Sequence, residues 1–308
     1  MKRGAQGETG FALISALLIV VAITAISVLL LERATRSRQR QSQVQAVLQT
    51  KAYLDGYENF VLAALDADLK NSASDHSAEA WATPRHVVAI DQGQAGGSIR
   101  DLQGRFNLNW LAGGDAVFGP ESFSRLMAEA GLPAQLGKAI VQWLSESGPA
   151  DRAPYRNRAR PIDPRGGTAG ILDELRDVAG MDAATFRRLQ AISTVIPAEG
   201  TININTAPGA VLRAVLPELA PGTISALMDE RTARPFASDA AFVDWITRSV
   251  SEITLAEIDL GRFSVSSNWF EAQIFATFHQ TQLRRRLILY RSPETGKTRV
   301  RFRLSSGH

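Results

Sequence analysis

The sequence predicts an α+β protein in which a long N-terminal helix packs on an antiparallel sheet, and a large all-helical insert interrupts the strands. Three features indicate this fold. Residues 11–31 carry no charge, and the chain continues without a proline to residue 70. Apolar residues within 120–260 recur at helical spacing. In 261–308, apolar and polar residues alternate as they do in strands.

The N-terminal helix is expected to have two parts. At about 1.5 Å per residue, residues 11–31 span roughly 30 Å, the thickness of a membrane's hydrocarbon core. Residues 32–70 continue the helix outside the membrane, because polar residues separate their apolar positions and one face remains to pack on the sheet. These apolar positions are Val44, Val47, Leu48, Leu54, Val61 and Leu65.

A polar leader, residues 1–10, ends in Gly10 and is followed directly by Phe11. An ordinary secretory peptidase cuts after the apolar region, whereas a cut between Gly10 and Phe11 leaves the helix on the mature protein. This layout resembles the class III signal of type IV pilins and type II secretion pseudopilins. The resemblance implies that a membrane-embedded prepilin peptidase removes the leader and N-methylates Phe11. An uncleaved signal anchor is the alternative.

The fifth residue counted from Phe11 is Ser15. Most pilins carry Glu there, and its carboxylate pairs with a neighbouring subunit's terminal amine in the apolar filament core, where an unpaired charge is costly. The absence of a carboxylate at Ser15 resembles the protein K family of type II secretion systems. The resemblance implies a minor pseudopilin at the filament tip, which has no earlier subunit above it.

Two segments further resemble this family. Residues 101–109 read DLQGRFNLN and residues 201–208 read TININTAP, close to two signatures of the protein K family. The family is built as a pilin-like head, here residues 71–119 and 261–308, interrupted by a helical insert, here residues 120–260. From the residues alone, Asn205 or Thr206 is expected to cap the following helix.

The expected elements follow from spacing and turn residues. The insert should contain helices at 121–130, 134–145, 171–178, 183–192, 208–216, 222–232, 238–247 and 255–260. Strands are expected at 86–90, 98–108, 262–265, 269–278, 283–291 and 298–304. In the strand at 283–291, Arg284 and Arg286 should share one face and Arg285 the other, either solvated or facing an acidic partner subunit.

Residues 172–192 and 209–231 look like weak repeats of a helix-hairpin-helix (SAM-like) unit. Such modules bind DNA through hairpin glycines whose backbone amides approach phosphates. The hairpins here, AGMDAAT and LAPGTIS, hold one glycine each, and Asp182 lies in the first. Packing of helices is therefore the favoured role. A membrane-anchored protein that captures DNA is the runner-up function, and a minor pilin of a type IV pilus is a third.

Composition argues against several chemistries. The chain has 308 residues, 45% of them hydrophobic, and no cysteine, so it has no disulfide, thiol nucleophile or thiolate metal site. Its 34 basic and 31 acidic residues give a net charge of +3, which calls for no nucleic acid. No enzyme activity is predicted, because no histidine lies near a nucleophile-elbow pattern. The histidines are His76, His86, His279 and His308.

Calcium is the one cofactor that the resemblance implies, bound by an acidic loop of the insert. The corresponding stretch, residues 142–170, offers only Glu146, Asp151 and Asp163 as scattered carboxylates among several arginines. Calcium takes six to eight oxygen ligands, usually with several carboxylates. A salt-bridged or solvated loop is therefore the favoured interpretation.

The resemblance implies a single-pass protein of the inner membrane with a cytoplasmic N-terminus and a periplasmic head. It would initiate or cap the periplasmic pseudopilus that serves protein export across the outer membrane. Its implied partners are other minor pseudopilins, the major pseudopilin, the prepilin peptidase, the inner-membrane secretion platform and membrane lipid. Charge argues for the opposite orientation, since Arg33, Arg36, Arg38 and Arg40 follow the apolar span while only Lys2 and Arg3 precede it.

Overall fold

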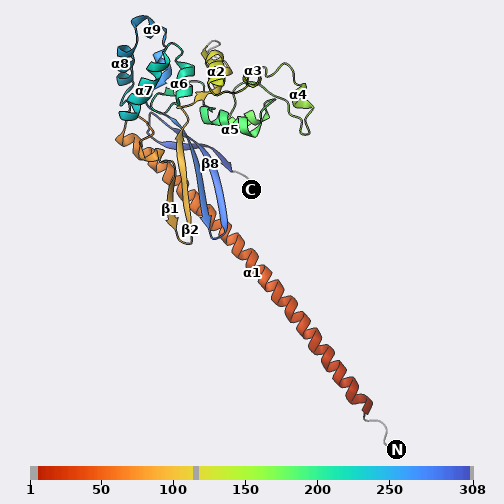
Figure 1. The fold of residues 1–308 in the computed structure, drawn as a ribbon. Coiled ribbons are helices and arrows are strands. Elements are labelled where there is room, and N and C mark those ends of the chain that lie inside the picture. Colours follow the sequence, from red (N-terminus) through yellow and green to blue (C-terminus); the bar gives the residue numbers. More distant parts are fainter. Residues whose placement is uncertain (1–5, 114–117, 306–308) are drawn as a thin grey trace, which may run out of the picture.

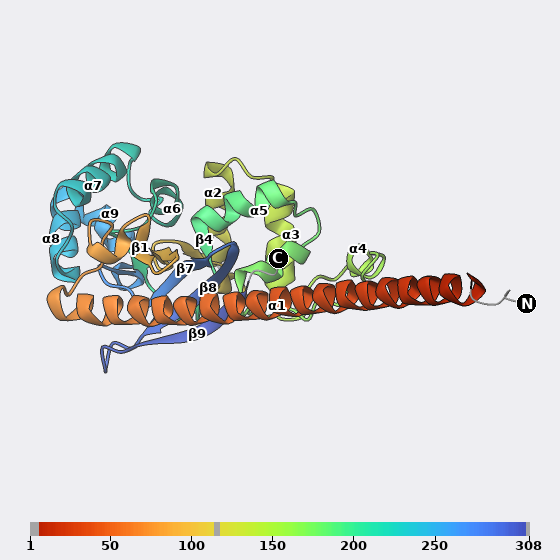
Figure 2. The ribbon, with the colours of Figure 1, turned by 90° about the horizontal axis from the view of Figure 1, so that it is seen from below.

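The structure is a computed structural model that describes residues 6–113 and 118–305. Helix α1 (Gln6–Asn71) runs for 66 residues. Its N-terminal half projects away from the rest of the molecule, and its C-terminal half lies along a sheet (Figure 1). The helical domain covers the end of the sheet next to the last turns of α1 (Figures 1 and 2).

The sheet has five strands in the order β1-β2-β7-β8-β9, and all neighbours are antiparallel. The strands are β1 (His86–Ile90), β2 (Gly93–Asp101), β7 (Trp269–Phe278), β8 (Thr281–Arg291) and β9 (Thr298–Ser305). Strands β2 and β7 pair side by side although the whole helical domain lies between them in sequence. The antiparallel sheet and the long helix confirm the predicted α+β class.

Helix α1 packs on the sheet through one apolar stripe. Leu54, Val61 and Leu65 are buried against Phe270 and Leu287, among other residues of the sheet. These three helix residues belong to the apolar series at helical spacing, so the stripe follows from the sequence pattern. Buried area of this kind is worth roughly 25 cal/mol per Å² of apolar surface, which favours docking of the helix.

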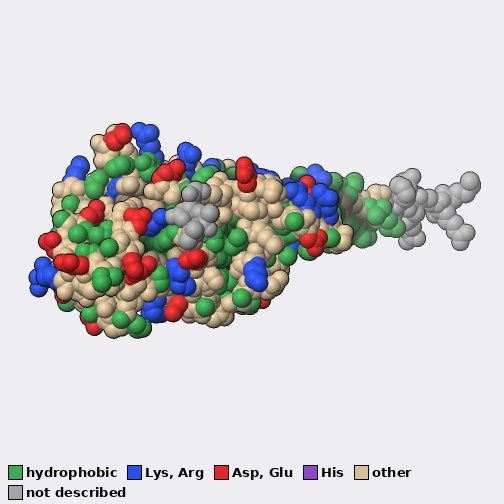
Figure 3. Space-filling model, turned by 90° about the horizontal axis from the view of Figure 1, so that it is seen from above, with side chains coloured by type: hydrophobic (Ala, Val, Ile, Leu, Met, Phe, Trp, Pro, Cys, Tyr) green, Lys and Arg blue, Asp and Glu red, His purple; other side chains and the backbone are tan. Residues whose placement is uncertain are grey.

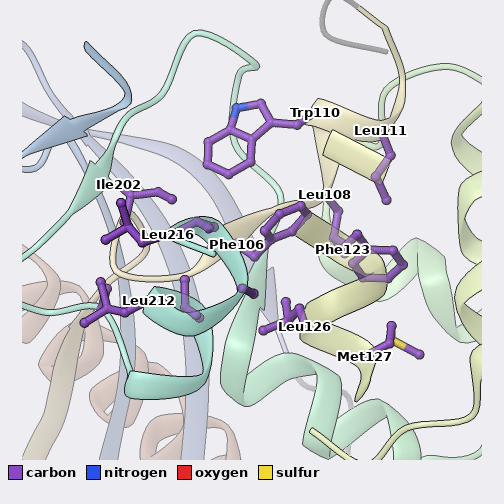
Figure 4. Close-up of a cluster of buried hydrophobic side chains, with 14 of the residues drawn as sticks. Phe106, Leu108, Trp110, Leu111, Phe123, Leu126, Met127, Ile202, Leu212 and Leu216 are labelled. Atoms are coloured by element: carbon purple, nitrogen blue, oxygen red, sulfur yellow. The ribbon is translucent and has the colours of Figure 1, made fainter. Parts of the chain in front are cut away.

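The helical domain has its own core (Figure 4). Phe106, Phe123, Leu126, Ile202 and Leu212 are fully or almost fully buried in it. Its α-helices are α2 (Phe118–Glu129), α3 (Ala134–Leu144), α4 (Ala153–Arg156), α5 (Ala183–Ile192), α6 (Gly209–Val215), α7 (Pro221–Ala233), α8 (Asp239–Ser249) and α9 (Glu252–Glu257). Its 3₁₀ helices are η2 (Leu108–Leu111), η3 (Leu172–Asp177) and η4 (Leu260–Arg262). A further 3₁₀ helix, η1 (Ala80–Ala82), lies between α1 and β1, and its Trp81 packs in the core between α1 and the sheet.

Two short parallel ladders brace the helical domain where the chain enters and leaves it. Strand β3 (Phe106–Asn107) pairs with β4 (Ser193–Thr194), and β5 (Ile202–Asn203) pairs with β6 (Phe263–Ser264). Because Phe106 lies in the helical core, that core includes chain before the predicted boundary at residue 120.

Several elements differ from the sequence prediction. The strand expected at 98–108 ends at Asp101, because the chain bends away through a close approach of Gly104 to Thr206, where a Cβ would lie 2.6 Å from Thr206 Oγ1. The helix expected at 171–178 is the 3₁₀ helix η3, and α4 has no counterpart in the prediction. The helix-hairpin-helix arrangement of the insert stays a prediction.

Candidate assembly site

Exposed apolar side chains follow α1 from Leu13 to Leu31, and Figure 3 shows both apolar and basic side chains on the projecting part of the helix. Within the described residues, α1 is the one helix that is long and apolar enough to cross a membrane. Two hydroxyls of its apolar stretch are satisfied inside the helix: Thr24 donates to the carbonyl of Val20 and Ser27 to that of Ile23, both at 2.8 Å. This pairing lowers the cost of placing these side chains in lipid.

The residues predicted for processing lie near the start of α1. Gly10 and Phe11 are both within the helix, and their side chains fall outside the described residues. Ser15 lies one turn further along and is half-buried. Cleavage after Gly10, methylation of Phe11 and the role of Ser15 remain predictions.

Buried charges hold the C-terminal half of α1 on the sheet. Glu58 of α1 accepts hydrogen bonds from Arg285 at 2.6 Å and from Arg303 at 2.7 Å, and its side chain is only 7% exposed. Arg285 also pairs with Asp55 at 2.8 Å. Burial opposes ionisation of Glu58, but these two guanidinium groups outweigh it and hold the pKa of Glu58 below its ordinary value.

The basic run at 284–286 is split between two faces, as its alternation predicts. Arg285 points to α1, whereas Arg286 pairs with Asp173 of η3 in the helical domain. Arg284 donates to Gln282 at 3.3 Å. Arg286 therefore joins the sheet to the helical domain of its own chain.

A buried polar network, the junction, joins the sheet to the helical domain. Its centre is Asp101 at the end of β2, whose Oδ2 accepts from the Thr206 hydroxyl at 2.5 Å and the Ser267 hydroxyl at 2.7 Å. The side-chain amide of Asn203 donates to the same oxygen at 3.0 Å and to Ser267 Oγ at 2.9 Å. Burial raises the pKa of Asp101 against the opposing effect of these donors.

Gln103 extends the junction by bridging three chain segments. Its side-chain oxygen accepts from the backbone N–H of Asn268 at 2.6 Å, and its side-chain amide donates to the carbonyl of Thr201 at 3.1 Å. Its own carbonyl accepts from the N–H of Asn203 at 2.9 Å. The two family-like segments, 101–109 and 201–208, are therefore in direct contact.

Three buried asparagines continue these segments into the helical domain. Asn107 and Asn109 bond backbone groups of residues 196–197 and 169. Asn205 exchanges two 2.9 Å bonds with the backbone of Phe236. The expectation that Asn205 or Thr206 caps α6 is wrong, because Pro208 is the N-cap and both side chains are used in tertiary contacts instead.

Arg291, at the end of β8, connects the junction to α1. Its guanidinium is 2% exposed and lies 3.3 Å from Asp68 of α1, 2.6 Å from Asp75 Oδ1 and 2.8 Å from the Ser267 carbonyl. Asp75 in turn accepts from the N–H of Ser267 at 2.7 Å. Burial raises the pKa of Asp75 to about 7 although Arg291 opposes the shift. Sequence reasoning missed Arg291, Asp75 and Ser267, because no local pattern marks them.

Two of the three carboxylates weighed for calcium, Asp151 and Asp163, accept hydrogen bonds from other groups of the protein. Asp163 accepts from Arg152 at 2.9 Å and Arg156 at 3.0 Å, which hold the pKa of Asp163 below its usual range. Asp151 accepts from the N–H of Ala153 at 2.9 Å. Within the described chain, the group of carboxylates close enough to share a metal does not include Glu146, Asp151 or Asp163. Arg152 and Arg156 thus supply the counter-charge for Asp163.

Backbone contacts complete the closure of the same loop. The N–H groups of Gly148 and Gly167 both donate to the carbonyl of Ser145, at 2.9 and 2.8 Å. Gly166 has a φ of +74°, and a Cβ there would lie 2.2 Å from the nitrogen of Gly148. Only glycine fits such a crossing without a backbone shift.

The two hairpins weighed for DNA binding differ in chemistry from a phosphate site. Asp182 caps α5 and accepts from the N–H of Thr185 at 2.7 Å, so a carboxylate already holds the helix start where a phosphate would bind. In the second hairpin Pro221 is the first residue of α7 and has no N–H to donate. Both features favour packing over phosphate contact.

A projecting apolar helix that continues along an antiparallel sheet defines the class of pilin-like subunits. Two family models described as "Type II secretion system (T2SS), protein K" match residues 104–198 and 202–265. The chain is 29% identical over 263 residues to type II secretion system protein K of Pseudomonas aeruginosa, covering 79% of this chain and 78% of the relative. It is 30% identical over 261 residues to type II secretion system protein K of Klebsiella pneumoniae, covering 77% of this chain and 79% of the relative.

The fold is also similar to a solved structure. The crystal structure of the GspK-GspI-GspJ complex from the enterotoxigenic Escherichia coli type 2 secretion system contains a chain that matches with a TM-score of 0.71 and 23% identity. The match covers 89% of this chain and all of the other. The chain belongs to the type II secretion system protein K family, and at this level it is a minor pseudopilin of that system.

Proposed function

We propose that this minor pseudopilin occupies the tip of the periplasmic pseudopilus and initiates or caps its assembly. The observation that carries the proposal is the position of the helical domain at the membrane-distal end of α1 (Figure 1). In a filament of parallel helices, the helical domain would lie beyond the end of α1 and would leave no room for a further subunit there. The absence of a carboxylate at Ser15 supports the same placement, since a tip subunit has no amine above it to neutralise.

The membrane steps of the proposal rest on the N-terminal helix. The prepilin peptidase would cut after Gly10 and methylate Phe11, and residues 11–31 would stay in the inner membrane with the head in the periplasm. Arg36 donates to Glu32 at 2.9 Å, but the positive-inside rule counts basic residues and not net charge. The proposed orientation therefore rests on the resemblance of the leader to the class III signal. The subunit would act by assembly and carry out no reaction.

The proposed partners contact α1 between the membrane and the head. Val44, Val47 and Leu48 are exposed apolar residues on this stretch, and exposed apolar positions at helical spacing favour packing against another helix. The similar solved structure is titled a complex of GspK with GspI and GspJ. We infer from this that other minor pseudopilins pack along α1, with the major pseudopilin below.

Site-directed cross-linking tests this proposal, because the chain has no cysteine and any introduced thiol is unique. Leu48→Cys in membranes is expected to cross-link to minor pseudopilins that carry a cysteine on their own helices. Ile253→Cys on α9, where Ile253 is 78% exposed, is the matched control. A tip subunit should give no pseudopilin cross-link from Ile253. Pilus components captured at Leu48, or pseudopilins captured at Ile253, would contradict the placement.

A further inference from the structure

Three carboxylates converge where α1 ends and the chain turns towards the sheet. They belong to Asp68 in the last turns of α1 and to Asp75 and Glu79 in the segment before η1. One oxygen of each lies within 4.8 Å of the other two. Two oxygens that bind the same calcium-sized ion at 2.3–2.6 Å lie no more than about 5 Å apart. The three oxygens therefore satisfy the distance condition for one hard cation.

This group carries more negative charge than its surroundings balance. The side chains of Asp68, Asp75 and Glu79 are 14%, 2% and 8% exposed. Arg291 is the cation that pairs with the two aspartates, and it supplies a single charge. Buried carboxylates without a counter-charge are costly, so the surplus favours either a bound cation or protons.

The carboxylate of Glu79 is fixed through one oxygen, while its other oxygen has no hydrogen-bond partner. Its Oε2 accepts from the N–H of His76 at 2.9 Å and from the indole of Trp81 at 2.7 Å, which fixes the carboxylate in place. Its Oε1 is buried and has no hydrogen-bond partner. His76 Nε2 lies 3.8 Å from that oxygen, too far for a hydrogen bond. A buried carboxylate oxygen without a hydrogen-bond partner, held beside two other carboxylates, can accept a further ligand such as a cation.

We propose that Asp68, Asp75 and Glu79 bind a hard divalent cation of the calcium class. Three carboxylate oxygens and no cysteine favour a cation that prefers oxygen ligands, and the remaining positions would be filled by water. The site is separate from the arginine-rich loop at 142–170. It would also strengthen the junction, because Asp75 already contacts Ser267 and Asn203.

Protons are the competing occupants of the same group. Burial raises the pKa of Asp68, and the nearby Glu79 adds to that shift. The other charged or titratable groups facing the three ligands are His76, Arg291 and, through Asp75, Asp101. Binding is measured at about pH 8, because a higher pH favours the ionised carboxylates and reduces the competition of protons with calcium.

The test uses the full chain in detergent micelles, stripped with a chelator and then titrated with calcium chloride alone. We expect saturable binding with a dissociation constant on the order of 0.1–1 mM, together with a rise in the melting temperature. Magnesium and zinc chloride are the comparison arms, and weaker binding of both is expected, since magnesium demands stricter geometry and zinc prefers nitrogen and sulfur ligands.

Glu79→Gln is the main variant, because glutamine keeps an oxygen for His76 and Trp81 while removing the charge. It should weaken calcium binding at least about tenfold, since affinity follows the count of charged ligands. Asp163→Asn, in the loop at 142–170, is the matched control and should bind as the parent does. If Glu79→Gln fails to fold, Asp68→Asn is measured instead, and the same loss of calcium affinity is expected. Absence of saturable calcium binding by the parent, or parent-like binding by both ligand variants, would overturn the proposal.

Discussion

Asp101→Asn tests whether the junction holds the helical domain on the sheet. The substitution keeps the shape of the side chain and removes its charge. If the asparagine oxygen keeps its bond from the Gln103 N–H, 2.7 Å in the parent, the new amide takes the place of Oδ2. That amide then faces Asn203 Nδ2, which lies 3.0 Å from Oδ2 and is itself a donor. The Thr206 and Ser267 hydroxyls can rotate to accept, but Asn203 cannot, because its own oxygen already bonds the N–H of Asn205.

The expected loss follows from these contacts. One hydrogen bond to a charged group disappears, worth about 1.5–3 kcal/mol. The Asn203 amide keeps the Asp75 carbonyl and Ser267 Oγ as acceptors, but it now faces a second amide donor. Removal of a buried charge returns part of this cost, since burial already disfavours the ionised form of Asp101. We expect a net destabilisation of about 1–3 kcal/mol.

The assay is urea unfolding of the full chain in detergent micelles, followed by tryptophan fluorescence. Trp269 begins β7 and Trp110 lies in the helical core, so the fluorescence reports unfolding of both the sheet and the helical domain. Thr206→Val and the double variant Asp101→Asn/Thr206→Val complete a double-mutant cycle. A coupling energy of about 0.5–3 kcal/mol is expected between the two positions. A midpoint equal to that of the parent for Asp101→Asn, or strict additivity in the cycle, would refute the reasoning.

Three further predictions concern α1. The pKa of Glu58 is lower in the folded protein than its ordinary value of 4.5. Ionised Glu58 therefore stabilises the folded state above pH 4.5, and this stabilisation is lost as the pH falls through the lower folded-state pKa. Glu58→Gln should therefore cost about 1.5–3 kcal/mol at neutral pH, and the difference from the parent should shrink in acid unfolding curves; a constant difference would contradict this. Gly10→Leu should leave the leader attached, so that mass spectrometry finds no Phe11 terminus; a normal Phe11 terminus would sink the prediction. Ser15→Glu should still insert into the membrane, as fractionation would show, whereas loss of insertion would argue against the pilin-like reading.

Much of the fold could be predicted because its signals are local. The long helix follows from an uncharged stretch and apolar spacing without a proline, and the closing strands follow from alternation. Alternation extended the predicted strand at 98–108 too far, because Phe106 and Leu108 alternate with polar residues yet belong to the helical core. Alternation shows that side chains are buried on one side, but it does not show against which layer they are buried.

The junction could not be predicted, because its members are far apart in the chain. The family-like segments marked Asp101 and Asn203, but nothing in either segment shows that their side chains meet. Ser267 lies in a serine-rich stretch that reads as a turn, and Arg291 reads as an ordinary strand end although it is 2% exposed. Such pairings become visible only when β2 and β7 are placed side by side.

The junction also determines how the helical domain can move. The chain crosses between the sheet and this domain twice, after β2 and before β7, and Asp101, Asn203 and Ser267 cross-link both crossings at their base. A pivot of the domain would separate these groups and leave buried polar atoms unpaired, at about 1–3 kcal/mol each. Arg291 extends the same restraint to α1 through Asp68, and it also pairs with Asp75. Under the proposed tip placement, a partner that packs against α1 would therefore also set the orientation of the helical domain.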